Sequence, residues 1–136
     1  MASPSLCRRE DSALLIVDVQ TRLAAAMPAE ARAGVLRNAG ILIEAATALG
    51  IPVVQTEQYP RGLGATEPEL AERLAGTARR LEKTSFSCCG ADGFDAAVCA
   101  DGRTQWILCG MEAHVCVLQT ALELHARGLE VFVVED

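Results

Sequence analysis

Three residues of complementary chemistry follow or end apolar segments of the sequence: Asp18, Lys83 and Cys116. A cysteine reacts as a nucleophile in its thiolate form, and a nearby ammonium or the positive end of a helix lowers the pKa of the thiol. A carboxylate can accept the thiol proton and later return it to a leaving group. Backbone N–H groups between Gly110 and Cys116 can stabilise an oxyanion. Together the three side chains indicate attack of a thiolate on a carbonyl carbon.

Each of these side chains alone has an ordinary structural explanation. Asp18 is equally well explained as a loop residue or cap after a strand. Lys83 by itself is more often a solvated surface charge. Cys116 by itself is more often a small buried residue of an amphipathic helix. Only a common location would make the three a site, and that location depends on the elements around them.

The elements that must position these residues are strands that alternate with helices. Residues 13–17 are a continuous apolar run, which is typical of a strand buried on both faces. Similar reasoning predicts further strands at 51–56, about 80–85, 104–109 and 129–134. Residue spacing and end signals predict helices at about 28–49, from about 66, at 92–100 and at 113–127. This alternation favours right-handed βαβ units and a mainly parallel sheet.

Residues at the predicted element ends set the boundaries. Gly50 and Gly128 follow helices as stops. Residues 66–69 (TEPE) are predicted to form a capping box, in which the Thr hydroxyl and the Glu carboxylate satisfy free N–H groups. Asp92 is predicted to cap the helix that follows it. Ligands of a parallel sheet bind at the carboxyl ends of strands, so the three reactive side chains are expected on one rim.

Composition disfavours several classes of function. The 136 residues carry 12 Lys and Arg against 18 Asp and Glu, a net charge of −6, and the basic residues form no stripe. Nucleic-acid binding needs clustered cations, so we expect no nucleic-acid partner. We find no secretory signal and no apolar run that could span a bilayer, and therefore expect no membrane partner and a cytoplasmic location. The 6 cysteines lack zinc-ligand spacing and are expected to be reduced thiols.

One domain is expected at this length. Residues 1–12 are predicted to be a mobile leader before a domain of residues 13–136. The sequence stops at Glu135 and Asp136, directly after a predicted strand, although a parallel sheet needs helices on both faces. One more helix–strand unit of about 30 residues would complete the alternation. We therefore expect that the domain is truncated at its C-terminus and lacks this last unit, or that a partner covers that side.

Three motifs, in this order, resemble the isochorismatase-like cysteine hydrolases. They are residues 14–20 (LLIVDVQ), 82–87 (EKTSFS) and 110–117 (GMEAHVCV). Residues 55–64 (QTEQYPRGLG) are most similar to the isochorismatase-domain-containing subgroup. The resemblance extends from about residue 13 to the last residue. It is specific for the family and not for a substrate.

The resemblance implies a three-layer α/β/α, Rossmann-like fold with a triad of Asp18, Lys83 and Cys116. The Cys116 thiolate would attack an amide-like carbonyl of a small molecule, Asp18 would carry the proton, and Lys83 would stabilise the thiolate. The resemblance also implies a cis peptide bond between Met111 and Glu112, which would aim N–H groups, including that of Cys116, at the oxyanion. Family members often assemble, so a homo-oligomer is expected.

Two departures from the family pattern narrow the implied activity. Nicotinamidases of this family carry a metal-binding Asp-x-His motif after the second strand, where residues 56–59 here read TEQY. We therefore expect no metal, no other cofactor and no nicotinamidase activity. True isochorismatases lack the nucleophilic cysteine that this sequence retains, so cleavage of a vinyl ether is also disfavoured.

Neighbours of the triad are open to more than one interpretation. Gln20, Tyr59 and Phe86 flank the triad segments and are candidates for the substrate pocket, although packing explains Tyr59 and Phe86 equally well. His114 lies two residues before Cys116, and residues two apart on a helix face different ways. This spacing favours the Asp18 carboxylate as the base.

Two alternatives to a hydrolase remain. A non-catalytic interaction or scaffold protein could retain the fold without a reactive thiol. A thiol-redox protein would need a resolving cysteine within disulfide reach of Cys116, for which Cys109 is a candidate. Cys88 and Cys89 have no predicted role.

Overall fold

The computed structural model describes residues 5–136, so residues 1–4 of the predicted leader lie outside the described residues. Its elements, in chain order, are β1 (Ser12–Val17), α1 (Thr21–Ala25), α2 (Ala29–Leu49), β2 (Val53–Gln58), α3 (Pro60–Leu63), α4 (Pro68–Leu74), β3 (Ala78–Lys83), the 3-10 turn η1 (Cys88–Gly90), α5 (Phe94–Ala100), β4 (Gln105–Gly110), the π-helical turn η2 (Ala113–Val117), α6 (Leu118–Ala126) and β5 (Glu130–Val133). Within this described part, none of the helices is long and apolar enough to cross a membrane.

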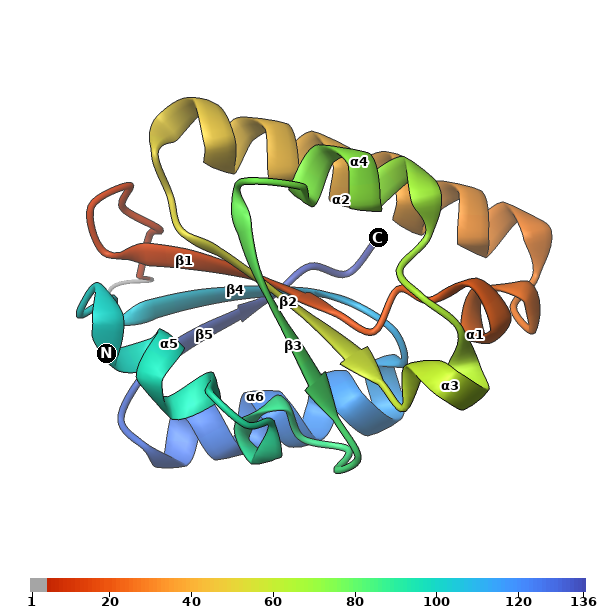
Figure 1. Cartoon of the computed structure of the whole chain (residues 1–136). Helices are drawn as coiled ribbons and strands as arrows, with labels where there is room; N and C mark the ends of the chain where they lie inside the picture. The colour runs from red at the N-terminus through yellow and green to blue at the C-terminus, as the bar shows by residue number, and fades with distance from the viewer. Residues whose placement is uncertain (1–4) are drawn as a thin grey trace.

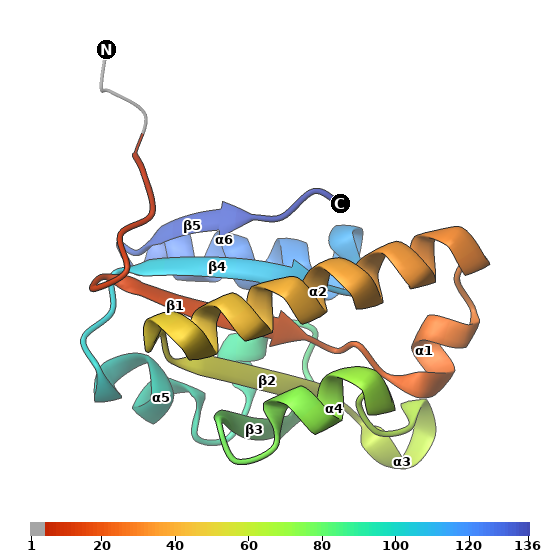
Figure 2. The ribbon, with the colours of Figure 1, turned by 90° about the horizontal axis from the view of Figure 1, so that it is seen from above.

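The strands of residues 5–136 form one five-stranded parallel sheet in the order β3-β2-β1-β4-β5. Figure 1 shows α2 and α4 on one side of the sheet and α5 and α6 on the other, and Figure 2 shows the molecule from above. The predicted α/β fold with its mainly parallel sheet is confirmed. The chain starts at the central strand β1 and adds β2 and then β3 toward one edge of the sheet. It then returns past β1 and adds β4 and β5 toward the opposite edge. The carboxyl ends of β1 and β4 therefore flank a topological switch point, where open α/β sheets bind ligands.

The central strand β1 is buried on both faces because its alternate residues serve two separate cores. Leu14 and Ile16 pack in the cluster that contains residues of α2 and α4. Ala13, Leu15 and Val17 pack in the opposite cluster with residues of η1, α5 and α6. Successive side chains of a strand point to opposite faces, so an uninterrupted apolar run is what this position requires.

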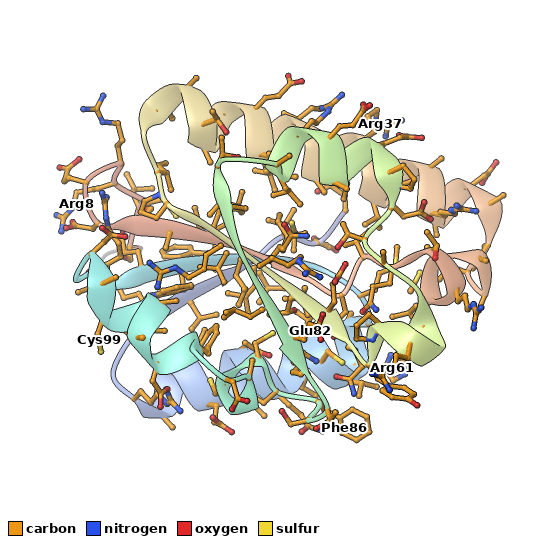
Figure 3. The ribbon with its side chains drawn as sticks, viewed as in Figure 1. Arg8, Arg37, Arg61, Glu82, Phe86 and Cys99 are labelled. Carbon is orange, nitrogen blue, oxygen red and sulfur yellow. The ribbon has the colours of Figure 1, made fainter. Side chains whose placement is uncertain are left out.

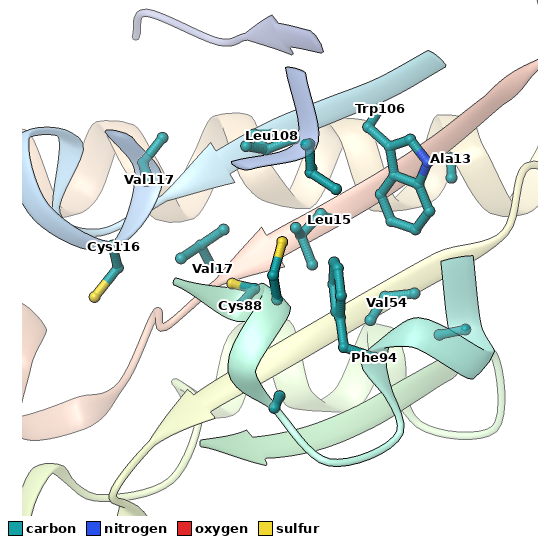
Figure 4. Close-up of a cluster of buried hydrophobic side chains, with 14 residues drawn as sticks. Ala13, Leu15, Val17, Val54, Cys88, Phe94, Trp106, Leu108, Cys116 and Val117 are labelled. Atoms are coloured by element: carbon teal, nitrogen blue, oxygen red, sulfur yellow. The ribbon is translucent and has the colours of Figure 1, made fainter. Parts of the chain in front are cut away.

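The cluster on the α5 and α6 side reaches the carboxyl edge of the sheet, as Figure 4 shows. Its largest side chains are Trp106 of β4 and Phe94 of α5, whose ring centroids are 5.9 Å apart at a tilt of 49°. Cys88 and Cys116 belong to the same cluster. The predicted nucleophile therefore lies against apolar core rather than on an open surface.

The predicted capping box is wrong, because its threonine is used elsewhere. The Thr66 hydroxyl donates to Glu57 Oε2 at 2.8 Å, and the Thr66 N–H donates to the same oxygen at 2.6 Å. The N-cap of α4 is Glu67, with no side-chain cap. A buried carboxylate is a stronger acceptor than a neutral group and is costly to leave unpaired, so it takes the hydroxyl.

Two further local predictions differ from the structure. Asp92 does not cap α5, which begins at Phe94 after Gly93 in the left-handed conformation, with φ 85°. The single helix predicted at 113–127 is divided into η2 and α6. The short helices α1 and α3 were not predicted, since segments of four or five residues carry too little periodicity to be recognised.

The described part of the predicted leader lies against the start of β4. The Arg8 N–H donates to Gln105 Oε1 at 2.7 Å, and Gln105 Nε2 donates to the Leu6 carbonyl at 2.9 Å. Strand β1 begins at Ser12. The division of the chain at residue 13, the mobility of the leader and the truncation after β5 stay predictions.

Gly110 ends β4 at a point where the backbones of β1 and β4 approach closely. It has φ 137° and pairs with Val17 in the parallel register. A side chain at Gly110 would collide with the backbone of Val17. Gly110→Ala is therefore expected to lower the free energy of unfolding by about 2–5 kcal/mol, from the collision and the unfavourable φ together. Urea denaturation of the full chain measures this loss.

Gly34→Ala is the matched control for this variant. A Cβ at Gly34, inside α2, would meet no atom within 4 Å. We expect this substitution to be neutral or to stabilise by about 0.5–1 kcal/mol, because alanine is the better helix former. Equal losses in the two variants would contradict a special requirement for glycine at position 110.

Candidate active site

Asp18 follows β1 at the carboxyl edge of the sheet and is fully buried, with 0% exposure. Its φ of 50° is left-handed, a conformation that aspartate adopts more readily than most residues. Asp18 Oδ1 accepts a hydrogen bond from the Thr56 hydroxyl at 2.8 Å. Asp18 Oδ2 accepts one from Lys83 Nζ at 2.7 Å. Each carboxylate oxygen therefore has a donor, as a buried charge requires.

Lys83 is the last residue of β3, and its side chain is also fully buried. The register of β2 and β3 sets Gln58 beside it. Besides Asp18, Lys83 Nζ donates to Gln58 Oε1 at 2.7 Å and to the carbonyls of Ser85 and Phe86 at 3.0 and 2.9 Å. An ammonium has three protons, so four acceptors leave none of them free for a substrate. Lys83 therefore holds and neutralises the Asp18 carboxylate rather than presenting a cation to solvent.

Cys116 lies in η2, between β4 and α6, and is only 6% exposed. Its carbonyl accepts a hydrogen bond from the Thr120 hydroxyl at 2.6 Å, and the same hydroxyl accepts one from the Cys88 N–H at 2.9 Å. Because β1 and β4 are neighbours, Asp18 and Cys116 follow adjacent strand ends, and the Asp18 carboxylate is near enough to raise the pKa of the Cys116 thiol. The structure brings the thiol, the carboxylate and the ammonium together at one edge of the sheet.

The environment of Cys116 raises the pKa of its thiol to about 11, which is opposite to the lowering expected from the sequence. Burial contributes most, a hydrogen bond to Asp18 and the negative charge of Asp18 add to it, and the charge of Lys83 opposes it. The expectation is wrong because Lys83 is already paired and because the thiol is covered by core. The resting form of Cys116 is therefore the thiol.

Alkylation of Cys116 by iodoacetamide is expected to be slow at neutral pH and to accelerate up to about pH 11. The thiolate is the reactive form, and below a raised pKa its fraction is small and grows about tenfold per pH unit. Peptide mass spectrometry from about pH 7 to 11 measures the rate, with the exposed Cys99 as an internal reference. A plateau already reached below about pH 8 would show a thiolate that the site stabilises at rest.

The segment predicted to form the oxyanion site contains the cis peptide bond between Met111 and Glu112. Met111 is buried, and its N–H donates to the Val17 carbonyl at 2.8 Å, so this amide is not free for a substrate. The Glu112 carbonyl accepts two N–H groups of η2, both at 3.2 Å, which ties that turn to the cis segment. The N–H of Cys116 stays the predicted donor to an oxyanion.

Gln20 is fully buried, and the backbone uses its side-chain amide. Nε2 donates to the carbonyls of Gln58 and Gly64 at 2.9 and 2.7 Å, and Oε1 accepts from the Gln58 N–H at 2.6 Å. Gln20 therefore ties the start of α1 to the end of β2 and to the end of α3. It does not occupy a position open to a substrate, in contrast to the sequence prediction.

Tyr59 lines a cavity of about 360 Å³ that reaches Lys83, with Arg61 on its wall. Tyr59 and Phe86 are exposed, and Figure 3 shows Phe86 and Arg61 at the surface near the carboxyl end of β3. Phe86 does not line this cavity, and neither does the Cys116 thiol. Of the three triad residues, only Lys83 therefore lines this cavity.

His114 is exposed, and its Nε2 lies 3.6 Å from a Glu112 carboxylate oxygen. This location agrees with the preference for Asp18 over His114 as the partner of the thiol. Within residues 5–136, no group of three or more His, Cys, Asp or Glu residues is arranged to hold a metal ion. All six cysteines are free thiols in the structure.

Thr56, Gln58 and Thr120 also contact triad residues, and the sequence did not indicate them. A threonine or a glutamine in a strand or helix has no distinctive pattern. One signal could have found the first two: both lie in the second half of β2, whose register sets Gln58 beside Lys83. That signal needs the strand order, which the sequence does not supply.

A thiol, a carboxylate and an ammonium lie at the carboxyl edge of a parallel sheet that has helices on both faces, which defines a three-layer, Rossmann-like α/β protein with a cysteine at its candidate site. Residues 12–136 match the family model described as Isochorismatase domain. The chain belongs to the isochorismatase family. Mouse isochorismatase domain-containing protein 2A is 38% identical over 130 residues, which are 93% of this chain and 59% of that protein. The predicted family and subgroup are confirmed.

Solved structures share the same fold. The MAR1 ribonuclease of Caenorhabditis elegans is 40% identical, with a TM-score of 0.85, over 96% of this chain and 65% of that chain. The YcaC gene product of Escherichia coli, described as an octameric hydrolase of unknown specificity, is 26% identical, with a TM-score of 0.84, over 98% and 66% of the two chains. The present chain spans about a third to three-fifths of the length of the curated relatives it matches.

Proposed function

We propose that this protein hydrolyses a small amide-like substrate through a thioester on Cys116. The observation that carries the proposal is the fully buried pair of Lys83 Nζ and Asp18 Oδ2, 2.7 Å apart, whose charges act on the pKa of the Cys116 thiol. Burying such a pair costs desolvation energy that well-packed apolar residues would avoid. Titratable groups that converge at such a cost are typical of active sites.

In the proposed reaction, Asp18 accepts the proton of the Cys116 thiol while the sulfur attacks the carbonyl carbon. The electrons of the C=O bond move to its oxygen, which the Cys116 N–H stabilises. The C–N bond then breaks, and Asp18 donates the proton to the departing amine. Water then attacks the thioester carbon while Asp18 takes a proton from that water. The C–S bond breaks, the acid is released, and Asp18 returns the proton to the sulfur.

Lys83 acts in this scheme by holding the Asp18 carboxylate in place and balancing its charge. Its protons are committed to four acceptors, so it does not bind the substrate directly. A resting thiol with a raised pKa fits a mechanism in which the base removes the proton only as the sulfur attacks. At neutral pH only a small fraction of Cys116 is then thiolate, which slows adventitious oxidation or alkylation.

The proposed substrate is small. This size follows from the family resemblance alone, because the cavity of about 360 Å³ beside Lys83 does not include Cys116. The octameric E. coli structure supports the expectation of a homo-oligomer, which stays a prediction together with a cytoplasmic location.

Phosphodiester hydrolysis is a second candidate, because the 40% identical C. elegans structure is described as a ribonuclease. RNA binding draws most of its affinity from clustered cations along the phosphate backbone. A net charge of −6 without a basic stripe disfavours this activity. Incubation with a labelled RNA oligonucleotide, with Cys116→Ala as the comparison, distinguishes the two candidates.

Intact-mass spectrometry of the full chain with a panel of small primary and secondary amides tests the proposal. An acyl adduct that maps to Cys116, together with release of the amine, is the expected result. A folded chain that forms no adduct and hydrolyses no amide would instead favour the scaffold alternative.

A further inference from the structure

Thr56 is a buried polar residue next to the triad that the proposed reaction does not use. It lies near the end of β2, is 1% exposed, and pairs with Val17, the residue before Asp18. Its hydroxyl has two partners: Asp18 Oδ1 at 2.8 Å and Cys88 Sγ at 3.5 Å. Both partners belong to segments that are remote from β2 in sequence, so the fold has set this hydroxyl between them.

The chemistry of the partners gives these two hydrogen bonds a direction. An ionised carboxylate only accepts, so the single hydroxyl proton of Thr56 goes to Asp18. The Thr56 oxygen is then left as the acceptor for the Cys88 S–H. Cys88 stays a thiol, because burial raises its pKa. The bonds therefore run from Cys88 to Thr56 to Asp18 and give Asp18 a second donor beside Lys83.

We propose that Thr56 is a positioning residue whose hydroxyl orients Asp18 and limits how strongly Asp18 holds the Cys116 proton. The inference rests on the proposed function. With one donor on each oxygen, the carboxylate plane cannot turn about its Cβ–Cγ bond. Each donor also takes up part of the negative charge, so that Asp18 can accept the proton without retaining it. A carboxylate held by Lys83 alone would be the stronger acceptor for the thiol.

Two conservative substitutions separate the effect of the Thr56 hydroxyl from the effect of the side chain's shape. Thr56→Val keeps the shape and removes the hydroxyl, whereas Thr56→Ser keeps the hydroxyl and removes a methyl group. The measurement is the rate constant for iodoacetamide alkylation of Cys116 in the full chain at about pH 8.5, read by peptide mass spectrometry. We expect the rate to fall about 3- to 10-fold in Thr56→Val, which corresponds to a rise of about half to one unit in the thiol pKa. In Thr56→Ser we expect a rate within about twofold of the natural chain.

If Thr56 had only a structural role, Thr56→Val would raise the alkylation rate of Cys116 instead of lowering it. Looser packing would expose both Cys116 and Cys88, and both thiols would react faster. An unchanged or faster rate at Cys116 in Thr56→Val, or an equal fall in Thr56→Ser, would overturn the inference. Cys88 must stay unreactive in every variant. If Thr56→Val does not fold, Thr56→Ala gives the same comparison with the hydroxyl removed.

The same preparation separates this inference from the proposed function. Amide turnover by the natural chain is scored independently of alkylation. A chain that shows the contrast between Val and Ser at position 56 but hydrolyses no amide would overturn the hydrolase proposal and support the role of Thr56. A chain that hydrolyses amides without this contrast would overturn the role of Thr56 alone.

Discussion

Cys116→Ala is expected to lower kcat/KM for any amide substrate by about a thousandfold or more, because the thioester can no longer form. The acyl adduct seen by intact mass should disappear as well. The fold should persist, since alanine removes only one sulfur atom from the edge of the α5 and α6 cluster. Steady-state kinetics and denaturation of the same preparation measure both effects.

Two other cysteines serve as matched controls for this variant. Cys99 is exposed on α5, and Cys109 is buried in the cluster on the opposite face of the sheet. Cys99→Ala should leave turnover and stability unchanged. Cys109→Ala should keep turnover and destabilise by about 1 kcal/mol through the small cavity that it creates. Turnover that survives in Cys116→Ala would rule out the thioester route.

Lys83→Met is expected to lower the free energy of unfolding by about 3–5 kcal/mol, because it leaves the Asp18 carboxylate buried without its cation. Methionine has nearly the shape of the lysine stem, so the loss reports on charge and hydrogen bonding rather than on packing. Three other acceptors, Gln58 and the carbonyls of Ser85 and Phe86, also lose their donor. Urea denaturation at neutral pH measures the loss.

A double-mutant cycle with Asp18→Asn isolates the contribution of the ion pair. Once Asp18 is a neutral amide, removal of Lys83 no longer strands a charge, so Lys83→Met should cost less in that background. We expect a coupling of about 1–3 kcal/mol between the two substitutions. Additive losses would show that Lys83 stabilises the site through its other acceptors and not through Asp18.

The sequence indicated Cys116 and Lys83 as reactive residues, whereas their contacts depend on the tertiary structure. Asp18 and Lys83 are 65 positions apart in the chain, and their 2.7 Å contact requires the strand order β3-β2-β1. The alternation of apolar strands with helices predicted a parallel sheet, and a parallel sheet sets the ends of its strands on one edge. The sequence therefore predicted that the three side chains lie at the same edge of the sheet. It did not predict which of them are adjacent there.

The exact ends of the strands were also not predictable from the sequence. Strand β2 begins two residues later than predicted and β3 two residues earlier, and their register sets Gln58 beside Lys83. Helix α2 and its stop at Gly50, which is left-handed with φ 69°, agree with the prediction within one residue. A long helix carries its own periodicity and end signals, whereas the ends of a buried strand depend on what its neighbours cover.

The sequence by itself determined the fold class, the family and the chemical types of the three reactive side chains, because apolar periodicity and motif spacing are local properties of the chain. Only the tertiary structure decided the state of those side chains. The pKa of Cys116 is raised because burial and the nearby Asp18 charge outweigh the already paired Lys83. Thr66 leaves its predicted cap for the buried carboxylate of Glu57. Both outcomes have one physical reason: in the interior, a polar group is governed by whichever partner the fold brings within hydrogen-bonding distance, and that partner comes from elsewhere in the chain.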